Sequence, residues 1–456
     1  MIHPSRIKIL NACSPPGGTY VLYWMQASQR TEYNHALEYA IEKANELNKP
    51  LVVFFGITDK FPEANLRHYA FMLEGLSETA AALDKRGIRM MVKCISPEKG
   101  ALEMSLNAVL TVTDRGYCAI QNKWRFWLAK KITCPLVQVE SDVIVPVETA
   151  SPKEEYSAGT FRPKLQKLLD AYLVPLKKRT LRKKSLSLTF ETLEIRDTES
   201  ILQKLKINRH VSRVKEYRGG TASAKKRLLY FIREKCNDLD KLRNEPSLDY
   251  LSNMSPYLHF GQVSPLYIAL QVKKAAPKDS SVYLEELIVR RELSMNFIHY
   301  NLHYDRFEGL PAWARKTLCD HKKDKRGYLY SLDTLEAAAT HDPYWNAAQN
   351  EMTLGGKMHG YMRMYWGKKI LEWSPEPEEA FSRAIYLNNK YSLDGRDPNG
   401  FTGVAWCFGK HDRAWKERPI FGKVRYMNAK GLERKFNMNE YVEKISQLKY
   451  HYNLKT

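Results

Sequence analysis

The first 145 residues alternate short apolar runs with amphipathic stretches. Five apolar runs predict buried strands, over residues 20–25, 50–57, 89–94, 108–114 and 135–141. Helical periodicity fills three of the intervening stretches, at 32–48, 65–87 and 118–131. Because strands that alternate with helices form parallel sheets, residues 1–145 predict an α/β domain with a Rossmann-like parallel sheet. No GxGxxG follows the first strand, so an ordinary dinucleotide site is not indicated.

The rest of the chain has a different pattern. From residue 217 onward nearly every segment has helical periodicity, interrupted by proline and glycine turns. Mixed polar sequence occupies 146–216, including the basic run 177–184, which we interpret as a solvated linker face. The pattern therefore predicts three parts: the α/β domain, an interdomain linker over 146–216, and a larger all-helical domain over 217–456.

One predicted helix carries an unusual pair of rings. In "GYMRMYWGKKILEWSPEP" (360–377), Trp366 and Trp373 lie seven residues apart, and Arg363 precedes them by one turn. Positions seven apart on a helix lie almost above one another, roughly 10 Å along the axis. Aromatic residues at this spacing are usually part of a core, so the spacing alone assigns them no function.

The composition favours a polyanionic partner. Lys and Arg number 72 against 51 Asp and Glu, a net charge of +21, which indicates nucleic acid ahead of an anionic membrane surface. The seven cysteines form no CxxC pair, so neither a zinc site nor a disulfide framework is indicated, and we expect no metal. The N-terminus has no apolar signal region and no run is long enough to span a membrane. We expect a soluble, intracellular, cytoplasmic protein.

The stretch "LSNMSPYLHFG" (251–261) has the features of an anion site. Ser252, Asn253 and Ser255 lead into Pro256, and proline is favoured at the first helical position. Free backbone N–H groups beside small hydroxyls suit a pyrophosphate, although a plain capped helix start has the same features.

"SPYLHFG" also resembles a sequence typical of photolyases and cryptochromes, and further motifs of that family follow in order. These are Arg243, Asn244 and Pro246, "EELIVRREL" (285–293), "HGYMRM" (359–364) and "LDGRDPNGFTGVAW" (393–406). Two others, "HDPYWNAAQNEM" and "YLNNKYSLDGRDPNG", are similar to class II cyclobutane pyrimidine dimer photolyases in particular, as is "VLYWMQASQRTEYNHAL" near the N-terminus. The resemblance extends over the whole chain.

The resemblance implies FAD in the helical domain, reduced and anionic in the active form, beneath a cleft for a flipped-out pyrimidine dimer. The implied cofactor-binding residues are Leu251, Ser252, Asn253, Met254, Ser255, Arg363, Asn388 and Asp394. Arg363 and Asp394 match an arginine–aspartate pair beside the flavin, where a guanidinium favours the anion and the carboxylate compensates it.

The sequence departs from the commoner pattern of the family at two places. Six residues after Asp394, where other classes have an asparagine facing the flavin, stands Gly400, so we assign that amide to Asn388. The second lesion-clamping tryptophan that other photolyases have after the Glu286 position is replaced by Val289 and Arg290.

The resemblance also implies lesion and DNA contacts. Glu286 matches a cleft glutamate that reaches the dimer carbonyls, which requires a protonated carboxyl or a bridging water, while Trp406 matches a dimer-stacking tryptophan and Met364 shares that pocket. The remaining expected DNA contacts are Arg243, Asn244, Lys410 and Arg413, the last two in the basic segment 409–435.

With the family in view, Trp366, Trp373 and a third class-specific ring, Trp345, predict a row that carries electrons from the surface to the flavin, in an order that spacing does not give. The predicted function is light-driven repair of UV-damaged duplex DNA by a monomer. The alternatives are a cryptochrome-like light receptor, which the presence of Glu286 and Trp406 disfavours, and a basic nucleic-acid-binding module with a degenerate flavin pocket. An 8-hydroxy-deazaflavin antenna is expected in the α/β domain; a folate, an empty antenna site and a 6–4 photoproduct substrate stay open.

Overall fold

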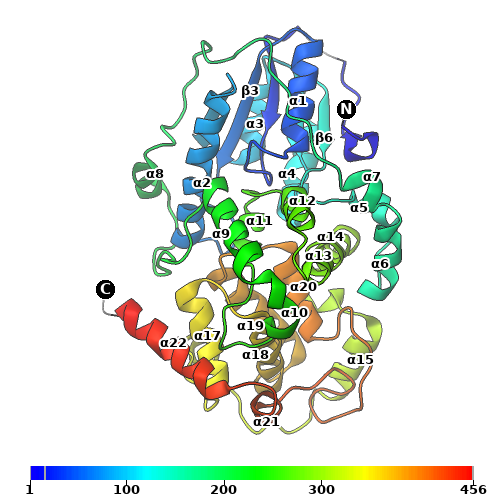
Figure 1. Ribbon diagram of the computed structural model, residues 1–456, viewed down its shortest axis with the longest axis vertical. Coiled ribbons are helices and arrows are strands. Elements are labelled where there is room, and N and C mark those ends of the chain that lie inside the picture. Colours follow the sequence, from blue (N-terminus) through cyan, green and yellow to red (C-terminus); the bar gives the residue numbers. More distant parts are fainter. Residues whose placement is uncertain (1, 15–16, 454–456) are drawn as a thin grey trace.

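The N-terminal half of the molecule is an α/β layer and the C-terminal half is helical, as the computed structural model of residues 2–14 and 17–453 shows (Figure 1). This confirms the predicted fold class. The sheet lies at one end of the long axis of the molecule and the helical half at the other, with α11 and α12 at the junction (Figure 1).

A six-stranded sheet forms the core of the N-terminal half, in the order β1-β6-β5-β2-β3-β4. The strands are β1 (Ile7–Ile9), β2 (Tyr20–Trp24), β3 (Leu51–Ile57), β4 (Arg89–Cys94), β5 (Ala108–Asp114) and β6 (Leu136–Val139). All pairings are parallel except that of β1 with β6. The central strands are buried along their whole length because helices cover both faces, which is why their sequences are continuous apolar runs. The predicted runs correspond to β2–β6, whereas β1 is too short to show a pattern.

Two pairs of helices cover the two faces of this sheet. The helices are α1 (His35–Glu46), α2 (Leu66–Asp84), α3 (Pro97–Ser105) and α4 (Ala119–Ala129). Side chains of α1 and α2 share one apolar cluster with the sheet, and those of α3 and α4 share another. The chain then crosses to the helical half through α5 (Val147–Ala150), α6 (Ala158–Gln166), α7 (Leu169–Tyr172) and α8 (Thr198–Lys204).

The helical half packs around the central helix α18 (Gly360–Trp373), which is buried on most of its sides. The other helices are α9 (Thr221–Glu234), α10 (Leu239–Leu242), α11 (Ser255–His259), α12 (Pro265–Ala275), α13 (Ser280–Leu284), α14 (Arg291–Tyr300), α15 (Ala312–Asp320), α16 (Leu332–Glu336), α17 (Pro343–Gly355), α19 (Pro377–Tyr391), α20 (Pro398–Cys407), α21 (Ala429–Glu433) and α22 (Met438–Asn453). Three short 3-10 turns are η1 (Pro4–Arg6), η2 (Cys236–Asp238) and η4 (Phe307–Gly309), and η3 (Glu285–Arg290) is a π-helical turn between α13 and α14.

The two halves meet in a close contact of backbone on backbone. Gly261 has a positive φ of 62°, and a Cβ there would lie 1.8 Å from the carbonyl oxygen of Ala27, so only glycine fits. The buried Arg30 guanidinium donates to Asp142 Oδ1 (2.7 Å) and to the Gly261 carbonyl (3.0 Å). This contact holds α11 against the sheet at the junction of the two halves.

Candidate functional site

The larger cavity lies within the helical half and has a volume of about 600 Å³. Its wall comes from the loop before α11, from η3, from α18 and from the turn that leads into α20. The predicted residues in this wall are Arg243, Asn244, Leu251, Ser252, Asn253, Met254, Ser255, Glu286, Arg363, Met364 and Asp394. The structure therefore brings most of the predicted site residues together in one place.

The 251–255 stretch is held in shape by local polar contacts. Asn253 adopts the left-handed conformation (φ 56°), and its side-chain amide donates to Asp249 Oδ1 (2.9 Å). The Met254 side chain is buried, whereas Ser252 and Ser255 remain partly exposed in the cavity wall. The stretch therefore presents small polar side chains to the cavity and is anchored by the buried Met254.

The predicted pairing of Arg363 with Asp394 differs from what the structure shows, because each side chain contacts another partner. The Arg363 guanidinium donates to the side-chain oxygen of Asn388 and lies 3.4 Å from Ser392 Oγ. Asp394 instead faces Lys357, with 3.8 Å between its Oδ2 and the lysine nitrogen. Burial raises the pKa of Asp394, but the charges of Lys357 and Arg363 outweigh that effect and hold it below its usual value.

Lys357 lines the cavity wall but was not among the residues predicted from the sequence. Its ammonium donates to Ser255 Oγ at 2.5 Å, so it links the 251–255 stretch to Asp394. Burial lowers the pKa of Lys357, opposed by the charge of Asp394. Its one signal in the sequence is the position two residues before the "HGYMRM" motif, which is not specific.

Asn388 occupies the space that a side chain at position 400 would need. A Cβ at Gly400 would lie 3.0 Å from Asn388 Nδ2. Because the Asn388 oxygen accepts from Arg363, its N–H₂ group is directed to this side, where Gly400 lines the cavity. An amide from α19 thus stands beside the gap left by the glycine on α20.

Glu286 lies at the edge of the cavity on the π-helical turn η3, and its carboxylate is paired. Arg243 Nη1 donates to Glu286 Oε1 at 3.0 Å, and both side chains are partly exposed. The Arg243 guanidinium holds the carboxylate at the cavity edge, and the expected protonated carboxyl or bridging water at the lesion stays a prediction. π-helical turns are rare and are frequent at functional sites.

Trp406 does not line the cavity, although Met364 does. Its half-buried ring on α20 lies between two cations: the Lys368 nitrogen is 5.7 Å from the ring centroid, and the Arg425 guanidinium carbon is 5.8 Å from it. Arg425 also lies 5.0 Å from the Trp415 ring, and the exposed Arg413 lies 5.1 Å from the same ring. Cations and aromatic rings therefore alternate from the protein interior to the surface.

Lys410 differs from the exposed DNA contact that was expected. It is 5% exposed, pairs with Glu154 and lies 4.2 Å from the centre of the Phe297 ring. Burial lowers its pKa. In this conformation Lys410 ties the segment after α20 to residues 153–156, while Arg413 remains available at the surface.

The three tryptophans lie in one buried row. Trp345 and Trp366 are 0% exposed and Trp373 is 2% exposed, so none of the rings reaches solvent. Trp345 Nε1 donates to the Trp366 carbonyl at 3.0 Å, and its ring centre lies 5.7 Å from that of Trp373 at 66°. Trp345 from α17 therefore contacts both α18 tryptophans.

The row continues to the surface through rings that were not predicted. Tyr330 and His341 lie 5.4 Å and 5.2 Å from Trp373, and the Tyr330 hydroxyl is 2.6 Å from His341 Nδ1. Tyr328, whose side chain is 51% exposed, stacks on His341 with 3.7 Å between ring centres.

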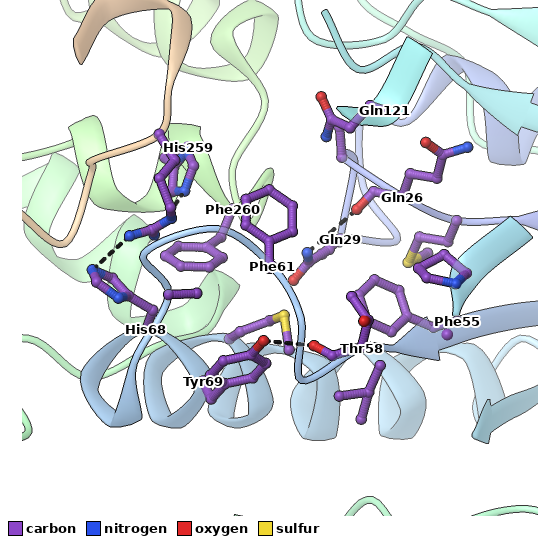
Figure 2. A pocket seen from close by; sticks show the side chains of 18 of the residues that line it. Gln26, Gln29, Phe55, Thr58, Phe61, His68, Tyr69, Gln121, His259 and Phe260 are labelled. Carbon is purple, nitrogen blue, oxygen red and sulfur yellow. Dashed lines mark hydrogen bonds between the residues drawn. The ribbon is translucent and has the colours of Figure 1, made fainter. Parts of the chain in front are cut away.

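The second cavity lies at the junction of the two halves and has a volume of about 110 Å³. Its wall is mostly aromatic, aliphatic and amide, with Phe61 and Phe260 between the His68 and His259 side and the Gln26 and Gln121 side (Figure 2). No sequence motif indicated it, because its wall comes from residues scattered between 25 and 396.

Arg396 is a residue of this cavity wall that remains positively charged at neutral pH. It has a φ of 64°, uncommon for a non-glycine residue, and its guanidinium donates to the Asn389 carbonyl (2.8 Å) and lies 2.9 Å from His68 Nε2. Burial lowers the pKa of Arg396 to about 10 and that of His68 well below its usual value. At neutral pH the histidine is therefore neutral and the arginine charged.

In the described part of the chain, no helix is long and apolar enough to cross a membrane. Within residues 2–14 and 17–453, no group of three or more His, Cys, Asp or Glu side chains is placed to hold a metal ion.

Comparison with known proteins finds close relatives along the whole chain. Residues 21–184 match the family described as DNA photolyase. The chain is 55% identical to the deoxyribodipyrimidine photo-lyase of Methanothermobacter thermautotrophicus, over 98% of this chain and 99% of that one. It is 40% identical to the protein of the same name from Arabidopsis thaliana, over 98% and 94%. Among solved structures, the bacterial class III photolyase from Agrobacterium tumefaciens has the same fold, with a TM-score of 0.72, 17% identity, and coverage of 95% and 87%.

Proposed function

The chain belongs to the deoxyribodipyrimidine photo-lyase family, and from this premise we propose that it is a class II photolyase that splits cyclobutane pyrimidine dimers in DNA. The observation that carries the activity is the 55% identity to a curated photo-lyase over nearly the full length of both chains. The class II assignment rests on the motifs at 341–352 and 386–400, and on the amide of Asn388 beside Gly400.

The family implies an FAD cofactor, and the residues of the 600 Å³ cavity fit one. Small polar side chains at 252, 253 and 255 suit phosphate oxygens, and the Lys357 ammonium beside Ser255 adds a cation there. When bound and reduced, FAD supplies the electron that light delivers to the lesion and that returns after the ring opens.

Arg363 and Asn388 are the residues we assign to the flavin ring. The guanidinium favours a negative charge on its neighbour and fixes the orientation of the Asn388 amide by donating to its side-chain oxygen. The Asn388 N–H₂ then points to the Gly400 side, where it can donate to a flavin nitrogen.

We assign the lesion to the open side of the cavity, between Glu286 and Trp406. Arg243 and Glu286 form a pair whose guanidinium can donate to the dimer carbonyls, on which negative charge develops during cleavage. Trp406 and Met364 supply apolar and stacking surface for the flipped-out bases. The net charge of +21 and the exposed Arg413 support mostly phosphate contacts to duplex DNA, made by a monomer.

We propose that the aromatic row carries electrons from an external reductant to the oxidised flavin. We assign the order Trp366, Trp345, Trp373, which the Trp345 N–H on the Trp366 carbonyl and the Trp345–Trp373 ring pair support, with Tyr330, His341 and Tyr328 extending it to solvent. Tryptophan and tyrosine rings are the oxidisable side chains such a path needs.

The junction cavity is proposed to hold an antenna, an 8-hydroxy-deazaflavin. Its aromatic and amide wall suits a flat heteroaromatic ring, and Arg396 suits an acidic hydroxyl on that ring. The absorption spectrum of the protein purified from its native source tests this, because a folate or an empty cavity gives a different spectrum.

The repair activity is tested with purified holoenzyme and duplex DNA that contains one cyclobutane dimer. We expect dimers to disappear in blue light and to persist in darkness, and a duplex with a 6–4 photoproduct to remain unchanged. If dimers persist in light while the protein contains FAD, the cryptochrome-like receptor becomes the better assignment.

A further inference from the structure

Lys368 is a completely buried lysine that no part of the proposed site requires. Its side chain is 0% exposed, and its ammonium donates to the backbone carbonyl of Cys407, at the C-terminal end of α20. Among the described residues it forms no ion pair with a carboxylate within 4 Å. A buried charge without a paired acid is costly to the fold.

The neighbouring residue shows how a lysine on this helix is ordinarily accommodated. Lys369 is also buried, but its nitrogen lies 2.7 Å from Glu372 Oε2, one turn further along α18. Among the described residues Lys368 has no carboxylate within 4 Å, so only more distant groups such as Asp412 offset its charge. What Lys368 does face is the ring of Trp406, at 5.7 Å from the centroid.

The backbone around Lys368 keeps its ammonium in place. A Cβ at Gly367 would lie 2.6 Å from Cys407 Sγ, so α18 and α20 approach as closely as glycine allows at this point. The carbonyl groups at a helix C-terminus carry partial negative charge, which favours a cation there. Met364, one turn before Lys368 on the same side of α18, lines the large cavity.

We propose that Lys368 is a positioning residue for dimer cleavage: its ammonium holds Trp406 and the end of α20, and its uncompensated positive charge favours the negative charge that develops on a lesion stacked against Trp406. The inference rests on the proposed function, since it takes Trp406 as the ring beneath the lesion. A preorganised cation in a dry site acts most strongly on charge that appears only during the reaction.

The protonation of Lys368 makes this charge dependent on pH in an accessible range. Burial lowers the pKa of Lys368 to about 8. The charged and titratable groups that face it are the Cys407 thiol on α20 and Asp412 and Arg425 in the segment after it. Asp412 raises the pKa and Arg425 lowers it, while burial also keeps the Cys407 thiol neutral by raising its pKa.

Activity and stability should therefore change in opposite directions with pH. Above about pH 8 the ammonium of the folded protein loses its proton, and the yield of repair should fall. The unfolded chain keeps its proton up to an ordinary lysine pKa of about 10.4, so it binds more protons than the folded state between these values and the free energy of unfolding rises with pH.

The test uses Lys368→Met, which fills the same space without charge, in FAD-loaded enzyme reduced chemically before illumination. Repair per absorbed photon at saturating dimer DNA, and the midpoint of urea unfolding, are measured from about pH 6 to about pH 10. We expect wild-type yield to fall through about pH 8, and Lys368→Met to have a yield about tenfold lower at pH 7, independent of pH and without loss of stability.

Two further variants complete the design. Lys368→Arg keeps the charge at all these pH values and should retain repair above pH 8, since arginine does not lose its proton there. Lys369→Met removes the compensated neighbour and should leave the yield and its pH profile unchanged. Wild-type repair with an unaltered yield and profile in Lys368→Met would overturn the inference, whereas absence of light-dependent repair in the wild type would overturn the proposed function itself.

Discussion

The two sides of α18 present different environments to their aromatic rings. On one side Trp366 and Trp373, with Trp345 from α17, are at most 2% exposed, and the indole N–H groups of Trp366 and Trp345 are bound internally, to Gln349 Oε1 (2.8 Å) and a backbone carbonyl (3.0 Å). On the other side the half-buried Trp406 lies between Lys368 and Arg425.

This difference matters for the charge each ring can tolerate. An oxidised tryptophan is positive, so two nearby cations disfavour it at Trp406, whereas the cation near Trp373, Lys369, is paired with Glu372. A cleaved dimer carries negative charge during the reaction, which the cations beside Trp406 favour. One helix thus separates a path that suits electron loss from a site that suits electron gain.

The largest expected effect comes from Trp366→Phe, which breaks the row at the ring nearest Arg363 on α18. Photoreduction of the oxidised flavin should be abolished, because phenylalanine is much harder to oxidise and the proposed path passes through this ring. Repair by chemically reduced enzyme should survive. Photoreduction is followed by the bleaching of flavin absorbance in blue light with a thiol reductant; bleaching at the wild-type rate would return these rings to a purely structural role.

The complementary change is Trp406→Ala, on the opposite side of the same helix. Stacking on an aromatic ring contributes about 1–3 kcal/mol per base, so the affinity for dimer-containing duplex should fall about 5- to 150-fold. The affinity for undamaged DNA and the rate of flavin photoreduction should stay at their wild-type values. The measurement is fluorescence anisotropy with matched damaged and undamaged duplexes; an equal loss for both would mean that Trp406 contacts DNA without recognising the lesion.

The sequence predicted which residues share the large cavity better than it predicted how those residues pair. Resemblance to a family identifies which residues share a site, so Arg363, Asp394 and the 251–255 stretch were found together in one cavity wall. The resemblance could not predict which cation pairs with Asp394, because Lys357 reaches this carboxylate from a position set by the turn between α17 and α18. A one-dimensional motif carries no information about which of two nearby cations is closer to a carboxylate.

The same limit explains what the sequence missed. Heptad spacing placed Trp366 over Trp373, but the ring in contact with both comes from α17, and packing of two helices decides that. The junction cavity and the burial of Lys410 likewise depend on contacts between segments more than 100 residues apart. The sheet was predictable because fully buried strands have continuous apolar runs, a local property.

A smaller effect is expected from Glu286→Gln at the edge of the lesion site. The substitution keeps the shape of the side chain but removes the ion pair with Arg243, leaving that guanidinium free for the dimer carbonyls or for water. We expect a reduction of repair per photon of less than about tenfold, with photoreduction unchanged. A rise in the yield would mean that the ion pair restrains Arg243, the donor assigned to the dimer carbonyls, and that Glu286 is not needed to position it.

The smallest effect tests the outer end of the tryptophan row. Tyr330→Phe removes the hydroxyl that lies 2.6 Å from His341 Nδ1 and leaves the ring against Trp373. Loss of this hydroxyl prevents the phenol from giving its proton to the imidazole when it loses an electron, so an oxidised Trp373 should persist longer and photoreduction should slow by a few fold rather than stop. Tyr344→Phe is the matched control, since its hydroxyl bonds Glu433 at 3.0 Å and is not part of the row. Transient absorption of the oxidised tryptophan gives its lifetime directly. The lifetime could be unchanged in Tyr330→Phe while photoreduction is lost in Trp366→Phe. Electrons would then enter the row at Trp373 itself, and the path on this side of α18 would end inside the protein instead of at Tyr328.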